Sequence, residues 1–163
     1  MKKTLTLTLK MSEIIYDVQN KTYLTGKALN NGENHSHIAT MQANDDEENA
    51  SQVLRSITMA VAMLRNRLSE YLDTGSSSSG NEMMEPDDNL ELTLSMPSNF
   101  NNAVGRVVGE AAHQFIVSTA VADWFAITAK GETFDYTVSA VKALEVLEEA
   151  LCKRSRPSRI NNP

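Results

Sequence analysis

The feature that most constrains the fold is residues 101–128, a run of 28 residues without a proline. At helical rise this run would form a rod of roughly 40 Å. In its first half, apolar residues recur at the spacing of a helix with one buried face: Val104, Val107, Val108, Ala111, Ala112 and Phe115. Its second half, residues 115–127, is apolar on nearly every side, with Ser118, Thr119 and Asp123 as the main interruptions. We therefore expect one long central helix that the other elements cover.

Two short segments alternate between apolar and polar residues, which is typical of half-buried strands. In the first, Leu5, Leu7, Leu9 and Met11 alternate with Thr4, Thr6, Thr8 and Lys10. The second, residues 90–96, matches residues 5–11 at five of seven positions. The match suggests an internal duplication.

Residues 47–72 and 133–153 are predicted to form two further helices. The first has a regular apolar stripe: Leu54, Ile57, Val61, Leu64, Leu68 and Tyr71. Met59 and Met63 are interpreted as packing or interface residues of the same helix. The last helix is expected to bury Val138, Val141, Leu144, Leu147 and Leu151 and to expose Lys142, Glu145, Glu148 and Glu149.

The region between the first strand and residue 47 is less well defined. Ser12 is a candidate N-cap for a helix containing Ile14, Ile15 and Val18, although residues 14–29 also fit a hairpin that turns at Asn20 and Lys21. Residues 30–46 are polar and are expected to form a loop with a short helical turn. His35 and His37 lie there as solvated histidines, because a metal site needs three or four ligands. No metal site is predicted.

Pro97 and Ser98 are predicted start signals for the long helix. Within it, Gly105 and Gly109 form a GxxxG spacing, which indicates either close approach to another backbone or a tolerated pair. Trp124 and Phe125 are assigned to the core or to an interface. His113 is interpreted as a structural histidine, because no nucleophile or second base is placed near it by sequence.

The predicted organisation is two related halves joined by a linker. Residues 1–72 form the first strand–helix–helix half, residues 73–89 a flexible linker rich in Gly, Ser and acids, and residues 90–153 the second half. Residues 154–163 form a basic tail, and the halves are expected to make one domain. The fold class is α+β, mostly helical: two diverged strand–helix–helix copies share a small sheet covered by helices, with one long central helix.

The charge is unevenly placed along the chain. The net charge is −6, but Lys153, Arg154, Arg156 and Arg159 carry four of the 15 basic residues, which leaves 11 against 21 acidic residues, or −10, on the rest. These four residues are candidate partner-binding residues. The alternative is that Lys153 and Arg154 only complement the negative end of the last helix dipole.

The remaining composition excludes several classes of protein. The single Cys152 excludes an internal disulfide and fits a reducing compartment. Residues 1–11 lack the apolar core of a signal peptide, and the apolar run 115–127 is too short to span a membrane. No GxGxxG, P-loop, GxSxG or HExxH motif is present. We therefore expect a soluble intracellular protein that is not an enzyme, with no catalytic residues, no cofactor and no membrane partner.

If the two strands pair, the sheet has helices over one face and both outer edges stay open to another chain. An isolated two-stranded ribbon is marginal in water. Association of protomers through strand edges or helices would stabilise it, so the pattern suggests assembly rather than catalysis.

Several runs resemble a family of uncharacterised proteins encoded among virion structural genes in phages and prophages of gut Bacteroidales. The runs are MSEIIYDVQNKTYLTGKAL, NDDEENASQVLRSI, LTLSMPSNFN, HQFIVSTAVADWFAIT and the terminal KRSRP, and they span most of the chain except the linker. The resemblance transfers no catalytic or binding residue. It implies a small virion or tail-assembly component that resides in the cytoplasm of the bacterial host and then in the virion.

Three functions are therefore considered. The first is a phage structural or assembly protein, such as a connector, tail-completion or minor virion subunit, which forms a homo-oligomer and contacts other virion proteins. The second is a nucleic-acid-associated phage protein that uses the basic tail against phosphates. The third is an enzyme or ligand-binding protein, which a concave pocket gathering polar groups around His113 or Asp123 would favour.

Overall fold

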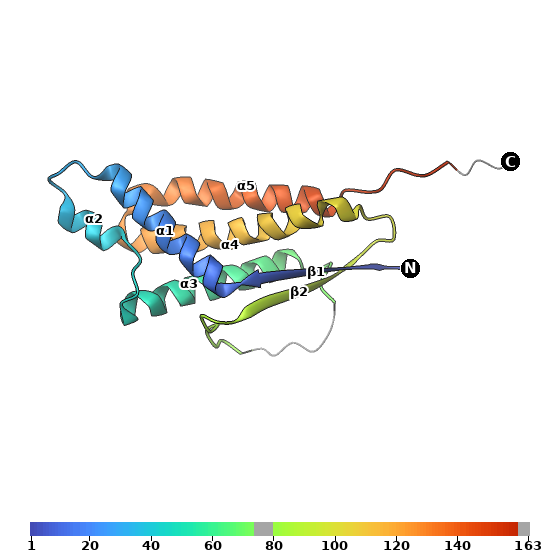
Figure 1. Cartoon of the computed structure of the whole chain (residues 1–163), viewed down its shortest axis with the longest axis horizontal. Coiled ribbons are helices and arrows are strands. Elements are labelled where there is room, and N and C mark those ends of the chain that lie inside the picture. The colour runs from blue at the N-terminus through green and yellow to red at the C-terminus, as the bar shows by residue number, and fades with distance from the viewer. Residues whose placement is uncertain (74–79, 160–163) are drawn as a thin grey trace.

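The computed structural model describes residues 1–73 and 80–159 (Figure 1). In chain order its main elements are β1 (Lys3–Lys10), α1 (Met11–Leu29), α2 (His35–Met41), α3 (Glu47–Arg67), β2 (Asn89–Met96), α4 (Gly105–Thr128) and α5 (Thr133–Leu151). Short 3-10 turns occupy Asn102–Val104 and Lys130–Glu132. The fold is α+β and mostly helical, as the sequence predicted. Among the described helices, none combines the length and apolarity that a membrane crossing needs.

The two predicted strands pair in an antiparallel sheet. Leu5 lies opposite Leu94, Leu7 opposite Leu92 and Leu9 opposite Leu90. Because side chains alternate along a strand, these leucines share one face, and all of them except the half-buried Leu5 are buried. Thr4, Thr6 and Thr8 are exposed on the other face. The predicted apolar and polar faces of the first strand are thus confirmed.

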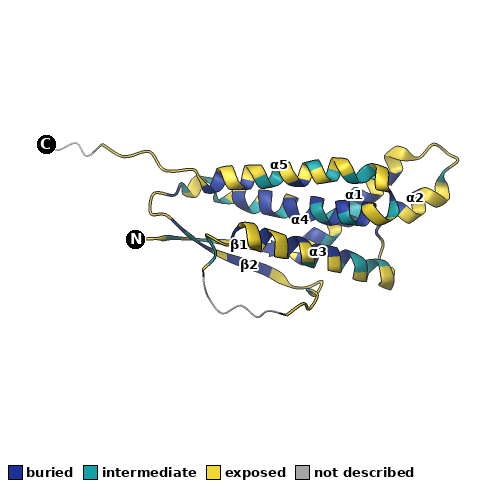
Figure 2. Cartoon of the chain, turned by 180° about the vertical axis from the view of Figure 1, so that it is seen from behind, coloured by how far each residue is buried: buried dark blue, intermediate teal, exposed yellow. Residues whose placement is uncertain are grey.

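Helix α4 is the central element of the helical layer. It packs against α5 on one side and α3 on the other, and α1 also contacts it (Figures 1 and 2). Most of its second half is buried: the buried residues from Phe115 onward are Phe115, Ile116, Val117, Ser118, Ala120, Val121, Ala122, Trp124 and Phe125. The expectation that other elements cover this apolar rod is confirmed, although Ile127 at its end remains exposed.

The start of α4 differs from the prediction. Pro97 and Ser98 do not begin the helix, because the N–H of Phe100 donates to the carbonyl of Pro97 at 2.9 Å and closes a turn that buries the Phe100 ring. The side chain of Asn101 then accepts from the N–H of Ala103 and caps the 3-10 turn that leads into α4. Val107, predicted to be buried, is 42% exposed.

Residues 14–29 are helical, which excludes the hairpin alternative. Helix α1 begins at Met11, so Ser12 lies inside its first turn and is not the N-cap. The physical reason is that β1 runs directly into the helix, and the carbonyl of Asp88 accepts the Met11 N–H at 3.1 Å. The Met11 N–H at the start of α1 thus has a backbone acceptor and does not need the side chain of an N-cap residue. His35 and His37 lie on α2 rather than in a loop, and both are exposed.

Helix α3 ends at Arg67, five residues before the predicted end at Leu72. Leu68 is buried, but the chain then turns, and the backbone of Tyr71 and Asp73 bonds to β2 instead of continuing the helix. Met59 and Met63 are 47% and 46% exposed, so they are surface residues of α3.

Helix α5 ends at Leu151 rather than Lys153, and its buried stripe is narrower than predicted. Val141 is exposed, and Val138 and Leu144 are only half-buried. The reason is that α5 packs chiefly against α4 alone. The residues it buries are Ala140, Leu147, Ala150 and Leu151. Lys142, Glu145, Glu148 and Glu149 are exposed as expected.

The predicted linker, residues 73–89, lies partly outside the described residues, because 74–79 are not described. The later part returns to α3. The N–H of Met84 donates to the Thr58 hydroxyl at 3.2 Å, and the Arg55 guanidinium donates to the carbonyl of Asn81 at 2.9 Å. Helix α2 makes the first half a strand followed by three helices, whereas two helices follow β2.

Candidate functional site

The two outer edges of the sheet are not equivalent. Along β2, the N–H of Asp73 donates to the carbonyl of Thr93 at 3.0 Å, and the N–H of Ser95 donates to the carbonyl of Tyr71 at 2.7 Å. Residues 71–73 therefore cover the C-terminal half of the β2 edge. This corrects the expectation that both edges stay open.

Within residues 1–73 and 80–159, nothing comparable covers the outer edge of β1. The register of the two strands continues to Met11 and Asp88, where the Met11 N–H donates to the Asp88 carbonyl. Because bonded residues alternate along an antiparallel strand, the odd-numbered residues of β1 are those that bond to β2. In an antiparallel pair the intervening residues point both backbone groups away from the partner, so Thr4, Thr6 and Thr8 point theirs outward. No described backbone group bonds to these three residues from that side. The edge offers three N–H and three C=O groups to another strand.

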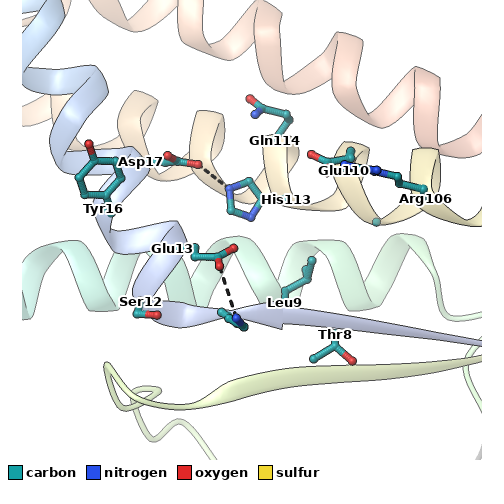
Figure 3. A pocket seen from close by; sticks show the side chains of 12 residues that line it. Thr8, Leu9, Ser12, Glu13, Tyr16, Asp17, Arg106, Glu110, His113 and Gln114 are labelled. Carbon is teal, nitrogen blue, oxygen red and sulfur yellow. Dashed lines mark hydrogen bonds and ion pairs between the residues drawn. The ribbon is translucent and has the colours of Figure 1, made fainter.

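A polar cleft of about 590 Å³ lies beside the end of this edge (Figure 3). Its walls come from β1, from the first two turns of α1 and from α4. The lining residues are Thr8, Leu9, Lys10, Ser12, Glu13, Tyr16, Asp17, Arg106, Gly109, Glu110, His113 and Gln114. Gly109 lies on the α4 wall, where a Cβ would have no neighbour within 4 Å.

The side chain of His113 makes one hydrogen bond among the described residues. Its Nε2 lies 2.6 Å from Oδ2 of Asp17, and the two side chains are 14% and 35% exposed. Figure 3 shows the carboxylate directed at the ring from α1. Ser12 also lines the cleft but makes no hydrogen bond to the ring, so the arrangement is not that of a serine nucleophile with its base. The pair instead ties α1 to α4.

The other charged groups of the cleft are paired with one another. Nζ of Lys10 lies 3.6 Å from a carboxylate oxygen of Glu13, and Nε of Arg106 lies 3.9 Å from one of Glu110. Both pairs are well exposed, so each contributes little to stability. The cleft therefore presents both signs of charge at its rim.

The four α4 residues singled out by sequence occupy different surroundings. A Cβ on Gly105 would lie 3.2 Å from Cδ1 of Leu5, so this glycine permits close approach of the strand side chain. Gly109 has no such neighbour and lines the cleft. Trp124 and Phe125 are core residues of the chain itself: the Trp124 indole donates to the carbonyl of Met41 at 2.8 Å, and the Phe125 ring lies 5.5 Å from that of Tyr136.

Asp123 lies apart from the cleft, between α3 and α4. Its carboxylate accepts from the buried hydroxyl of Ser56, which in turn accepts from Gln52 at 3.3 Å. This network joins two helices of the core.

The structure splits the four basic residues of the tail into two pairs. Lys153 donates to Glu149 at 2.6 Å, and Arg154 donates to the carbonyl of Leu151 at 2.8 Å, so both complement the end of α5. The backbone of residues 153–155 also bonds to that of residues 99–101. Arg156 and Arg159 are exposed beyond this contact, in the arm that extends from the body in Figure 1.

A second concavity, of about 760 Å³, runs between α4 and α5 and is mainly apolar. The half-exposed Val107 and Val146 face it, with Lys21, Arg106 and Lys142 at its rim. The exposure of Val107 is explained by this groove, which no described element fills.

The polar cleft around His113 is the kind of concavity that was expected to favour an enzyme or ligand-binding protein. Its other lining residues and the difference between the two edges were not predicted from the sequence. Asp17, Tyr16, Arg106 and Glu110 had no distinguishing local pattern. His35 and His37 gain no further ligand, because the described residues contain no group of three or more His, Cys, Asp or Glu suited to a metal ion. Comparisons with protein-family models, curated proteins and solved structures gave no match.

Proposed function

We propose that the chain is a phage structural or assembly protein that acts by oligomerisation and by contacts with other virion proteins. A connector, tail-completion or minor virion subunit fits this role. The observation that carries the proposal is the uncovered edge of β1, with its outward-pointing backbone groups at Thr4, Thr6 and Thr8. The resemblance to phage virion-associated proteins supplies the setting, the host cytoplasm and then the virion.

An uncovered edge is informative because proteins commonly protect strand edges with charges, bulges or covering segments. This chain covers the C-terminal half of the β2 edge with residues 71–73. On β1 the charges stand only at the two ends, Lys3 and Lys10, and the edge between them is regular, with three threonines in alternate positions. A two-stranded sheet is also marginal alone, so added strands would stabilise it. Together these features favour strand addition over catalysis, since the cleft beside the edge holds paired charges and no activated nucleophile.

We further propose that the two halves descend from a duplicated strand–helix–helix unit. Support comes from the equivalent partners in the sheet, where the three leucines of β1 face the three leucines of β2. Helix α2 has no counterpart after β2, so it would be an addition to the first copy.

The association is tested by light scattering on the purified chain and on two variants of one residue. Thr6→Pro removes an outward N–H without removing a bond to β2, and proline is tolerated on strand edges. Thr6→Val keeps the N–H and is the matched control. We expect the wild type and Thr6→Val to form the same discrete multimer and Thr6→Pro to dissociate. Circular dichroism verifies that each variant is folded, and Thr8→Pro provides a second test of the same edge.

The virion setting is tested by mass spectrometry of purified particles from a phage that encodes the chain. We expect the protein at a fixed copy number per particle. Its absence from particles and from assembly intermediates, together with a monomer that ignores the Thr6→Pro substitution, would contradict the proposal.

A nucleic-acid-associated protein is the second candidate, supported by the exposed Arg156 and Arg159. Lys153 and Arg154 are engaged within the chain, which leaves fewer cations for phosphates. This candidate predicts DNA binding that weakens with salt and disappears in the Arg156→Ala/Arg159→Ala variant. Binding that survives this substitution would exclude the tail as its source.

A further inference from the structure

We propose that the strand received by the β1 edge is β1 of a second copy of this chain, running antiparallel about a two-fold axis at Thr6. This inference rests on the proposed function and names its first partner. The product would be a continuous four-stranded sheet: β2 and β1 of one copy, followed by β1 and β2 of the other.

The spacing of the free backbone groups supports this partner. A two-fold axis at Thr6 places Thr6 opposite Thr6 of the second copy and Thr4 opposite Thr8. Both members of each pair point their N–H and C=O outward, so the three pairs would form six hydrogen bonds, two per pair. A shift by one residue would place outward groups opposite groups that already bond to β2. The edge is thus complementary to itself in this register.

The threonines and leucines of the two copies also face one another in this register, whereas Lys2 of each copy would lie opposite Lys10 of the other, a like-charge pair at each end of the new ladder. Threonine meets threonine on the polar face, a pairing that is favourable across antiparallel strands. On the apolar face, the half-buried Leu5 meets Leu7 of the second copy. A strand of another protein would have to supply the same alternation.

The charges of α4 provide a second complementarity. A two-fold axis between antiparallel strands is perpendicular to the sheet, so α4 of both copies would lie on the same face, with the cleft walls turned toward one another. Each wall carries one cation and one anion, Arg106 and Glu110, at exposed positions four residues apart. Antiparallel neighbours would therefore bring Arg106 of one copy near Glu110 of the other. Gly109, between them, leaves room for the approach.

The register is tested by single cysteines in a Cys152→Ser background. Opposite residues of a hydrogen-bonded antiparallel pair have Cα atoms about 5.5 Å apart, within the range of a disulfide. We expect Thr6→Cys to cross-link to itself under mild oxidation. Thr4→Cys and Thr8→Cys should not cross-link alone, because like residues would lie about 13 Å apart along the strand, but they should cross-link when mixed.

The charge complementarity is tested by reversal. Arg106→Glu places four carboxylates on the facing walls and Glu110→Arg places four cations, so each single variant should weaken dimerisation at least about tenfold. The double variant Arg106→Glu/Glu110→Arg restores opposite charges and should return the dimer to within about threefold of the wild type. Sedimentation equilibrium gives the dissociation constants.

The outcomes separate this inference from the proposed function. A monomeric wild type at all concentrations overturns the second copy as the partner. A multimer sensitive to Thr6→Pro in which Thr6→Cys does not cross-link overturns the two-fold register at Thr6. In that case the edge still receives a segment of a second copy in another register, and the proposed function stands. A multimer that ignores both Thr6→Pro and the cysteines overturns both.

Discussion

Nε2 of His113 lies 2.6 Å from the carboxylate of Asp17, and this contact joins α4 to α1 across the polar cleft. The two residues are 96 positions apart. The contact fixes the wall of the cleft next to the end of β1, so it helps to position the edge through which we propose that the chain assembles.

Removal of the histidine should therefore destabilise the fold. We expect His113→Ala to lower the free energy of unfolding by about 1–3 kcal/mol, because the partly buried Asp17 carboxylate loses its partner. Asp17→Asn retains a hydrogen-bonding side chain and should cost less. Urea unfolding followed by circular dichroism measures both, and a double-mutant cycle with Asp17→Ala gives the coupling. A coupling near zero would contradict a structural role for the pair.

The indole of Trp124 attaches α2 to the core through the carbonyl of Met41. Trp124→Phe keeps an aromatic ring but leaves a buried carbonyl without a donor, so the expected loss of stability is about 1–3 kcal/mol. Hydrogen exchange should show greater opening of α2 than of α5. If the substitution changes the exchange rates of α2 no more than those of α5, the attachment of α2 through Trp124 is contradicted.

The elements that the sequence predicted best are those specified by local periodicity. The alternation of leucine and threonine is sufficient to identify β1, and the apolar run from Phe115 is sufficient to identify the second half of α4. The end of α3 was predicted too late because Leu68 and Tyr71 continue its apolar stripe, whereas the backbone of Tyr71 is used by β2. Tertiary hydrogen bonds here override a helical pattern.

The cleft could not be predicted for a different reason. Its walls come from residues 8–17 and 106–114, about a hundred positions apart, and their charges look like those of any solvated helix. The difference between the two sheet edges also depends on where the chain goes after α3. The sequence predicts that a sheet of two strands has two outer edges, but it does not predict which of them the chain covers.

The end of α5 offers a prediction about pH. The hydrogen bond from Lys153 and its positive charge lower the pKa of Glu149 below the ordinary value of 4.5. Because the folded pKa is depressed, the stabilisation is present above the ordinary pKa and is lost as the pH falls through the lowered value. Lys153→Met should raise the pKa of Glu149 toward its ordinary value in an NMR titration, whereas Arg156→Met should not. An unchanged pKa in Lys153→Met would show that the pair does not persist in solution.

The two glycines of α4 should respond differently to alanine, although they lie one helical turn apart. Alanine at Gly109 gains helix propensity in open space, so we expect the free energy of unfolding to rise by about 0.5–1 kcal/mol. At Gly105 the added Cβ would lie 3.2 Å from Leu5, and the strand side chain would have to move. Gly105→Ala should therefore show no gain or a loss. Urea unfolding of both variants in the Thr6→Pro background, where association through β1 does not contribute, makes the comparison. Equal stabilisation by the two substitutions would show that Leu5 does not pack against α4 as closely as the structure indicates.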